Sequence, residues 1–132
     1  MINQESYIDK EYYMKKFNTE AAIEFWNLCG KIEKYSKKQG WFLTRNNNQA
    51  YVSFKYDDSI VFGLHYNNKN QLSIFFKITE HMVSNPEVLD FEMYYGHTQE
   101  ELRYYIPASA NIDLNLFDEH FEAAYENITS KK

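Results

Sequence analysis

The feature that most constrains the fold is a change of hydrophobic period at Gly40. Before this residue, apolar side chains recur every three or four positions, which predicts a helix with one buried face. After it, apolar and polar residues alternate, which predicts strands. Glycine often ends helices because it adopts left-handed backbone angles, so Gly40 marks the boundary. The helical face contains Ala22, Phe25, Trp26, Cys29, Ile32 and Ser36, and the strand runs cover residues 41–45, 49–56, 60–66 and 72–78.

The alternation within these runs also predicts how neighbouring strands pair. Residues opposite each other in an antiparallel pair lie on the same sheet face, so the apolar positions restrict the loop lengths. Asn and Asp residues between the runs favour tight turns. The predicted pairs are Leu43 with Val52, Tyr56 with Ile60 and Leu64 with Leu72, joined by loops at residues 47–48, 57–59 and 67–69.

The C-terminal half contains one clear helix and one ambiguous segment. Residues 114–128 place apolar side chains on one helical face. Residues 89–95 and 102–106 favour a fifth and a sixth strand, although residues 98–101 also match a helix capping box. The chain lacks repeats and Pro/Gly/Ser-rich linkers, so we expect a single domain over residues 1–132. The predicted fold class is α+β, an antiparallel meander of four to six strands flanked by an N-terminal and a C-terminal amphipathic helix in two layers.

Composition and charge indicate a compartment and a class of partner. Apolar residues make up 44% of the chain and aromatic residues 18%, which is enough for a core without crosslinks. Cys29 is the single cysteine, the N-terminus lacks a signal-peptide pattern, and no apolar run is long enough to cross a bilayer. We therefore expect a cytoplasmic protein that does not enter the membrane. The net charge of −5 disfavours non-specific phosphate binding and suits a basic or neutral partner.

The outward-pointing residues of the predicted sheet form a groove. In the predicted register, Ser53, Gly63 and Ser73 make a floor of small residues between larger walls. Such a groove can take a peptide, a nucleotide or a single-stranded nucleic acid, with aromatic rings stacking and basic groups supplying charge. Alternatively, the N-terminal aromatic segment or residues 79–111 cover this face. The candidate ligand-binding residues are Tyr51, Ser53, Lys55, Gly63, His65, Ser73, Phe75 and Lys77.

The two predicted helices carry stripes of opposite charge. Lys31, Lys34 and Lys38 form a lysine stripe near the end of the first helix, and carboxylates form an acidic stripe on the last. The acidic stripe is a candidate docking surface for a basic protein partner, where it would speed association more than it adds affinity. Alternatively, both stripes are solvated faces that complement the helix dipoles. The acidic stripe consists of Asp118, Glu119, Glu122 and Glu126.

Residue patterns typical of catalysis, metal binding or cofactor binding do not occur in the sequence. His65, His81, His97 and His120 lack the spacing of paired metal ligands. Cys29 has no His at hydrogen-bonding spacing, and the glycines are too isolated for a phosphate-binding loop. We therefore expect a protein that is not an enzyme and holds neither cofactor nor metal. A hydrolase is the third hypothesis, and it requires His81 and His97 to cluster with nearby carboxylates.

The layout of the chain resembles that of one bacterial domain family. A helix that ends in lysines precedes Gly40-Trp41 and a run of short strands, and the closing helix reads FDEHFEAAY at residues 117–125. Over about residues 20 to 128 this layout is similar to the domain described as a predicted transport protein, which occurs beside restriction-type nucleases. The resemblance implies a module associated with nucleic-acid enzymes. It implies no catalytic residue.

These observations lead to two functional hypotheses of different classes. The first is a non-catalytic intracellular binding protein of the small acidic inhibitor or immunity type found in bacteria and phages, because a compact, acidic, Tyr-rich domain has the composition of an interface. Its partner would be a protein. The alternative is a nucleic-acid- or nucleotide-binding accessory module that uses the open face of the sheet.

Overall fold

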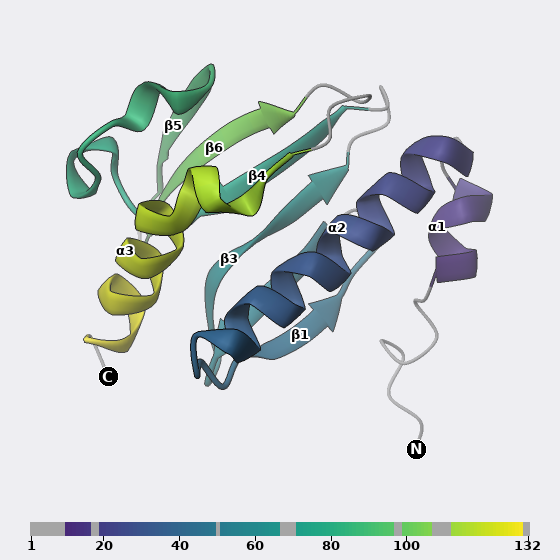
Figure 1. Cartoon of the computed structure of the whole chain (residues 1–132), viewed down its shortest axis with the longest axis horizontal. Coiled ribbons are helices and arrows are strands. Elements are labelled where there is room, and N and C mark those ends of the chain that lie inside the picture. The colour runs from purple at the N-terminus through teal and green to yellow at the C-terminus, as the bar shows by residue number, and fades with distance from the viewer. Residues whose placement is uncertain are drawn as a thin grey trace.

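The computed structural model of the chain describes residues 10–16, 19–49, 51–66, 71–96, 99–106 and 112–130. These residues form two layers, an antiparallel sheet and a layer of helices packed on one of its faces (Figure 1). The predicted α+β class is therefore confirmed. The helices are α1 (Lys10–Lys16), α2 (Thr19–Lys38) and α3 (Asp118–Thr129), and the strands are β1 (Thr44–Asn47), β2 (Tyr51–Tyr56), β3 (Ser59–Tyr66), β4 (Leu72–Phe76), β5 (Phe91–Tyr95) and β6 (Glu100–Ile106).

The strand order is β1-β2-β3-β4-β6-β5, so β6 lies between β4 and β5 (Figure 1). The first four strands form a meander. The chain then passes through two short 3-10 turns, η2 (Glu80–Met82) and η3 (Pro86–Val88), before β5 and β6 pair as a hairpin. The prediction of a fifth and a sixth strand is confirmed. The helix alternative is wrong, because residues 100–101 belong to β6.

The core lies between the sheet and the helices α2 and α3, and it is rich in aromatic rings. Phe62 and Phe76 of the central strands approach Phe121 of α3 with ring-centroid distances of 4.9 and 5.1 Å. Phe25 and Ile32 of α2 are fully buried in the same cluster. Burial of each such side chain contributes roughly 2 kcal/mol by removing apolar surface from water. These contacts hold both helices on one face of the sheet, which we call the inner face.

Helix α2 ends at Gly40 as the sequence predicts. Gly40 has a φ of 82°, a left-handed angle that side chains with a Cβ rarely adopt. Its backbone N–H donates to the Lys37 carbonyl at 3.0 Å, and the Trp41 N–H donates to the Ser36 carbonyl at 3.0 Å. These two bonds satisfy carbonyl groups that the end of a helix leaves without partners.

The first strand begins later than the sequence predicts. It covers Thr44–Asn47 rather than residues 41–45. Trp41 instead stacks on Tyr125 of α3, with ring centroids 4.6 Å apart and planes inclined by 11°. This aromatic contact holds the connection between α2 and β1 against the helix layer, so that strand pairing starts three residues further on.

Two of the predicted strand pairings are wrong by an even number of residues. An even shift leaves every side chain on its predicted face, because side chains alternate with a period of two. Hydrophobic alternation therefore cannot detect such a shift, and packing beyond the pair decides it. The structure pairs Asn47 with Val52 and Ile74 with Leu64, where the sequence predicts Leu43 with Val52 and Leu72 with Leu64.

The third predicted pairing holds as far as Phe54, which faces Phe62 as predicted, and a bulge shifts it by one residue beyond that point. Tyr56 faces Ser59 rather than Ile60, and the register shifts after Phe54. The turn therefore has two residues, beginning with Asp57, whose φ of 54° is one that Asp tolerates better than most residues. A bulge adds one residue to one strand and reverses the facing of the residues beyond it. Ile60 consequently lies beside side chains of the sheet face opposite the helices.

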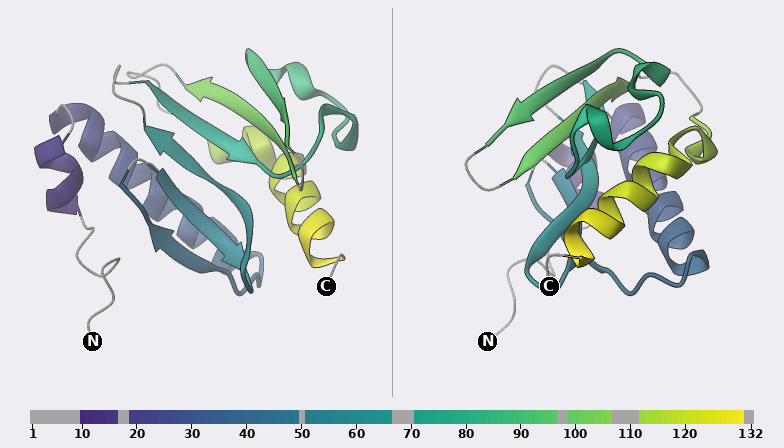
Figure 2. Two further views of the ribbon diagram at one scale, coloured as in Figure 1. Left: turned by 180° about the vertical axis from the view of Figure 1, so that it is seen from behind. Right: turned by 90° about the vertical axis from the view of Figure 1, so that its left-hand side faces the viewer.

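Helix α1 packs against α2 and lies away from that opposite face (Figure 2). Tyr13 is fully buried, its ring lies 5.0 Å from that of Phe25, and its hydroxyl donates to the Asn48 carbonyl at 2.5 Å. The part of the N-terminal aromatic segment before residue 10 lies outside the described residues. Among the described helices, none has the length and apolarity needed to cross a membrane.

Candidate functional site

The sheet face opposite the helices, which we call the outer face, carries a mixture of polar, charged and aromatic side chains. No described helix covers this face, and the view from behind in Figure 2 shows its strands in front of α2 and α3. Part of the segment predicted to cover it, residues 100–106, instead extends the sheet as β6. The outer-face residues are Tyr51, Ser53, Lys55, Gly63, His65, Ser73, Phe75, Lys77, Glu92, Tyr94, Glu101, Arg103 and Tyr105.

The outer face contains a hollow of about 330 Å³, which lies over β2, β3, β4 and β6. Half of the predicted ligand-binding residues line it, namely Tyr51, His65, Phe75 and Lys77. The other half, Ser53, Lys55, Gly63 and Ser73, do not. The remaining lining residues are Ile60, Glu101 and Arg103, which the sequence did not single out.

The predicted floor of small residues is wrong because β4 pairs in a different register. Gly63 faces Phe75 rather than Ser73. A Cβ atom added at Gly63 would lie 2.6 Å from Cζ of Phe75 and 2.3 Å from the carbonyl oxygen of Val52. The phenyl ring thus occupies the space above the glycine, which is where the predicted groove would have been deepest. The space open to a ligand lies to one side, around Arg103.

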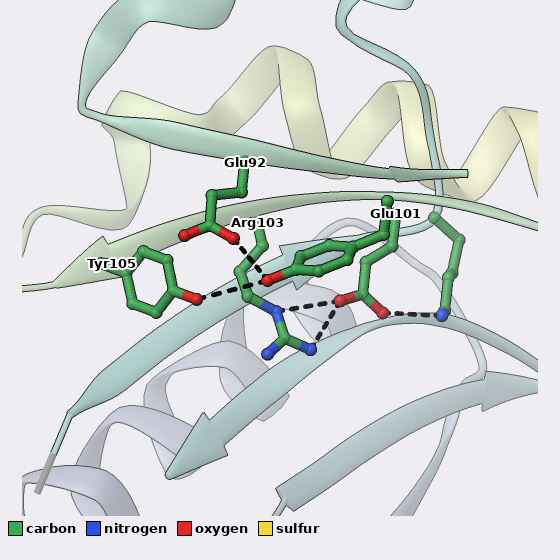
Figure 3. A network of polar contacts seen from close by, with 6 residues as sticks. Glu92, Glu101, Arg103 and Tyr105 are labelled. Carbon is green, nitrogen blue, oxygen red and sulfur yellow. Dashed lines mark hydrogen bonds and ion pairs between the residues drawn. The ribbon is translucent and has the colours of Figure 1, made fainter. Parts of the chain in front are cut away.

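Three charged residues form a network beside the hollow, which we call the Glu101 network (Figure 3). Lys77 Nζ donates to Oε1 of Glu101 at 2.8 Å. Arg103 donates to Oε2 through Nε at 2.9 Å and through Nη2 at 2.6 Å. The three side chains are only 14–19% exposed, so water screens them weakly. Two cations around one carboxylate leave the network with a net charge of +1.

Aromatic rings hold the guanidinium group of Arg103 in place. Its Cζ lies 5.7 Å from the centroid of Phe75 and 5.3 Å from that of Tyr94, both within the range of a cation–π contact. Tyr94 is itself anchored, because its hydroxyl donates to Glu92 at 2.5 Å and lies 3.4 Å from the hydroxyl of Tyr105 (Figure 3). These hydrogen bonds, first that to Glu92, raise the pKa of Tyr94.

His65 contributes an uncharged imidazole to the same face. Burial lowers its pKa, and the positive charge of Arg103 lowers it further. At neutral pH the ring is therefore neutral and offers one donor and one acceptor. Ser73 lies opposite His65 and Ser53 lies opposite Gly63. The hydroxyls of both serines are fully buried, and neither has a hydrogen-bond partner among the described residues.

The four residues of the acidic stripe are all exposed on α3, but two of them already have internal partners. Asp118 accepts a hydrogen bond from the hydroxyl of Tyr35 at 2.5 Å. Glu119 accepts bonds from both the backbone N–H and the hydroxyl of Ser84, and these bonds lower its pKa. They tie α3 to α2 and to the connection before β5. Glu122 and Glu126 are the two carboxylates of the stripe that have no hydrogen bond or ion pair with a described residue.

The lysine stripe borders a second, shallower hollow on the helix layer. Lys31, Lys34 and Lys38 line one side of it and residues 112–115 line the other, around a volume of about 480 Å³. The sheet and the helix layer thus each carry a basic hollow, but the side chains of the lysine stripe are exposed. In the hollow on the outer face, by contrast, the two cations are paired with a carboxylate that lines the same hollow.

The described residues contain no group of three or more His, Cys, Asp or Glu side chains that could hold a metal ion. His81 is exposed and lies 3.5 Å from Glu80. His97 lies outside the described residues, so its convergence with His81 stays a prediction. His120 is buried and serves the core, since its Nε2 lies 2.7 Å from the hydroxyl of Tyr104.

Sequence reasoning missed Glu101, Arg103 and Tyr105, although β6 contains the necessary signal. Polar Glu101 and Arg103 flank apolar Leu102, and this alternation would have placed Glu101, Arg103 and Tyr105 on one face of a strand. Their strand neighbour could not be read in the same way. β4 pairs with β6 and not with β5, the next strand along the chain, so the adjacency that brings Arg103 opposite Phe75 depends on topology.

Comparison with known proteins adds no family to these observations. No protein-family model, curated protein or solved structure matches this chain. The resemblance in layout to the predicted transport protein domain therefore stays a prediction. The geometry of the outer face and the charges of the helices are the basis for any functional proposal.

Proposed function

We propose that this chain is a non-catalytic binding protein that takes a protein partner on its outer sheet face. The observation that carries the proposal is the Glu101 network, which is ion-paired and mostly buried beside a hollow on a face that no described helix covers. Charged groups that are this buried cost free energy to desolvate unless they are paired. The three groups are paired, but two cations share one carboxylate, and the remaining positive charge at a surface hollow supports a ligand that approaches there.

The side chains around the hollow are of the types that dominate protein interfaces. Tyr51, Tyr94 and Tyr105 accompany Arg103 on this face, and Tyr and Arg are enriched among residues that contribute most to binding. Tyrosine offers a large contact area with few rotatable bonds, so it loses little conformational entropy on binding. The hydrogen bonds of Tyr94 reduce that loss further.

The charge of the outer face indicates the chemistry of the partner. The face carries the cations Lys55, Lys77 and Arg103 and the carboxylates Glu92 and Glu101, so its net charge is 3 − 2 = +1. The whole chain has a net charge of −5. The outer face is thus the place where this acidic protein would meet an acidic or neutral surface. The acidic stripe fits a basic partner, but half of its carboxylates are engaged within the chain.

The nucleic-acid alternative is less favoured by the geometry of the same face. Phe75 is only 4% exposed, so its ring cannot stack on a base. Glu92 and Glu101 would lie close to a phosphate backbone that followed the lysines across the sheet. Partner binding by a small inhibitor or immunity protein needs neither stacking nor a continuous basic track.

The proposal can be tested by capturing partners with matched variants of two surfaces. We would immobilise wild-type protein, a Tyr94→Ala/Tyr105→Ala variant of the outer face and a Glu122→Gln/Glu126→Gln variant of the acidic stripe. Each would be exposed to nuclease-treated lysate from the source cells, and retained proteins would be identified by mass spectrometry. Circular dichroism and thermal unfolding would show whether each variant keeps its fold.

The expected result is a protein retained by the wild type and by the acidic-stripe variant but lost by the outer-face variant. Loss with the acidic-stripe variant alone would move the binding surface to α3 and contradict the proposal. Retention of nucleic acid only, in lysate without nuclease, would favour the alternative function. A protein retained equally by all three would exclude both surfaces.

A further inference from the structure

We infer that the hollow beside Arg103 is a socket for a single carboxylate side chain, Asp or Glu, of the bound partner. The inference rests on the proposed function, because it names the group by which the outer face recognises a protein. It is carried by the hydrogen-bonding capacity, the charge and the shape of the residues that line the hollow.

Among the described residues, the Glu101 network leaves several strong donors without a hydrogen-bond partner. Glu101 takes the Nε hydrogen and one Nη2 hydrogen of Arg103, which leaves the second Nη2 hydrogen and both Nη1 hydrogens. Lys77 directs one of its hydrogens to Glu101 and keeps the others. Both cationic side chains line the hollow, so these donors are the polar groups that an entering ligand meets.

The charge of the network matches one negative charge. Lys77 and Arg103 contribute two positive charges and Glu101 one negative charge, at side-chain exposures of 16%, 19% and 14%. Glu92 lies opposite Arg103 on β5, but it is exposed and accepts a hydrogen bond from Tyr94. The positive charge left within the buried network is therefore poorly solvated. A carboxylate would neutralise it, whereas a dianionic phosphate would exceed it. The network therefore favours a carboxylate over a phosphate.

The contacts of Arg103 leave one edge of its guanidinium group for a ligand. Phe75 and Tyr94 lie within cation–π distance of Cζ, and Glu101 occupies the edge formed by Nε and Nη2. The edge formed by Nη1 and Nη2 has no further hydrogen bond to the described residues. Arg and carboxylate groups pair best edge to edge in one plane, as parallel N–H···O bonds. Arg103 is thus held in the orientation that such a pair requires before any ligand arrives.

The other walls of the hollow suit the stem of an acidic side chain. Tyr51 and Ile60 offer apolar surface, and the neutral ring of His65 adds no competing charge. The volume of about 330 Å³ is at the lower end of the range for small-molecule sites. It accommodates one side chain with its backbone rather than an extended ligand.

The test uses peptides as probes, since they present carboxylates in a protein context. Random 12-residue peptides displayed on phage would be selected on the immobilised full chain. Selected peptides would be synthesised, their dissociation constants measured by fluorescence anisotropy, and their binding surface mapped by amide chemical shifts. We expect peptides that shift outer-face amides and share one acidic residue. Changing that residue to Asn or Gln is expected to weaken binding about 10-fold or more.

A double-mutant cycle connects the acidic residue to Arg103. Arg103→Gln is expected to weaken binding of the acidic peptide about as much as replacing the peptide's acidic residue does. When both changes are made together, binding is expected to weaken little further. Lys55→Gln is the matched control, because it removes the same charge from the same face outside the hollow. We expect it to weaken binding by less than about threefold. If Arg103→Gln does not fold, Lys77→Gln serves in its place.

The possible results separate the inference from the proposed function. Peptides that bind the outer face without a required acidic residue, or with additive effects in the cycle, would overturn the inference and leave the proposed function intact. Selection that yields no peptide shifting outer-face amides would overturn both. Tighter binding by a phosphotyrosine peptide than by its Glu counterpart would overturn the preference for a carboxylate.

Discussion

Replacement of His120 by Phe is expected to reduce the dependence of stability on pH. His120 is 2% exposed, and its hydrogen bonding determines its tautomer. Tyr104 donates its hydroxyl hydrogen to the Pro86 carbonyl at 2.6 Å, since a carbonyl can only accept. Nε2 of His120 must therefore donate to the Tyr104 oxygen at 2.7 Å, and Nδ1 is left as an acceptor without a partner. A second proton on this ring would add a buried charge and an unpaired donor.

This arrangement makes the folded state resist protonation. Burial lowers the pKa of His120 from 6.5 to about 4, with a small opposing effect from Glu119. Between these two values the unfolded chain binds more protons than the folded chain, so the free energy of unfolding falls as the pH falls. At about 1.36 kcal/mol per pH unit below the unfolded pKa, the loss at pH 5 amounts to about 2 kcal/mol.

The measurement is urea unfolding at pH 7.5 and pH 5.0, followed by tryptophan fluorescence. The wild type is expected to lose about 2 kcal/mol more than His120→Phe between the two pH values. At pH 7.5 the variant should stay within about 1 kcal/mol of the wild type, because Phe preserves the ring contacts and only one hydrogen bond is lost. His81→Gln is the matched control, since His81 is exposed and should not alter the difference.

A different outcome would refute the reasoning. If His120→Phe loses as much stability as the wild type between pH 7.5 and 5.0, the proton is not excluded from this ring. The assignment of the tautomer and the cost of charging the ring would then both be wrong. A variant that fails to fold at pH 7.5 would instead show that the Tyr104 oxygen depends on the donated hydrogen.

Two further predictions concern single buried positions. Gly63→Ala should lower the free energy of unfolding by more than about 2 kcal/mol, because the new Cβ would lie 2.3 Å from a backbone oxygen that cannot move freely. Gly30→Ala is its control and should raise stability by about 0.5–1 kcal/mol, because nothing lies within 4 Å and the position is helical. Urea unfolding distinguishes them, and equal effects would contradict the model of the sheet. Cys29 should react with Ellman's reagent only after unfolding, since burial raises its pKa to about 12, and fast labelling of the native protein would contradict that burial.

Some residues of the predicted site were correct, but the predicted shape of the groove was wrong. Both results arise because alternation specifies the face of a side chain but not the strand register. Alternation placed Tyr51, His65 and Phe75 on the outer face, where the structure has them. It could not place Phe75 opposite Gly63, because an even shift in register changes no side chain's face. The hollow therefore lies beside the glycine rather than above it.

The sequence by itself determined the elements of this protein. The change of period at Gly40 specifies where α2 ends and the sheet begins, because a glycine can adopt the left-handed angle and backbone geometry sets the two periods. The same local rules specify the amphipathic faces of α2 and α3 and the alternation of the strands. These are properties of neighbouring residues, so they can be read without a partner element.

Only the tertiary structure decided what lies next to what. The stacking of Trp41 on Tyr125 delays β1, and the insertion of β6 between β4 and β5 brings Arg103 to Phe75. Such contacts join residues far apart in the chain, and their free energy depends on how whole side chains fill shared space. A strand shift of two residues leaves the local hydrophobic pattern unchanged, but it changes which side chains pack together. The Glu101 network forms because tertiary packing favours one strand order and register among several that the local sequence pattern does not distinguish.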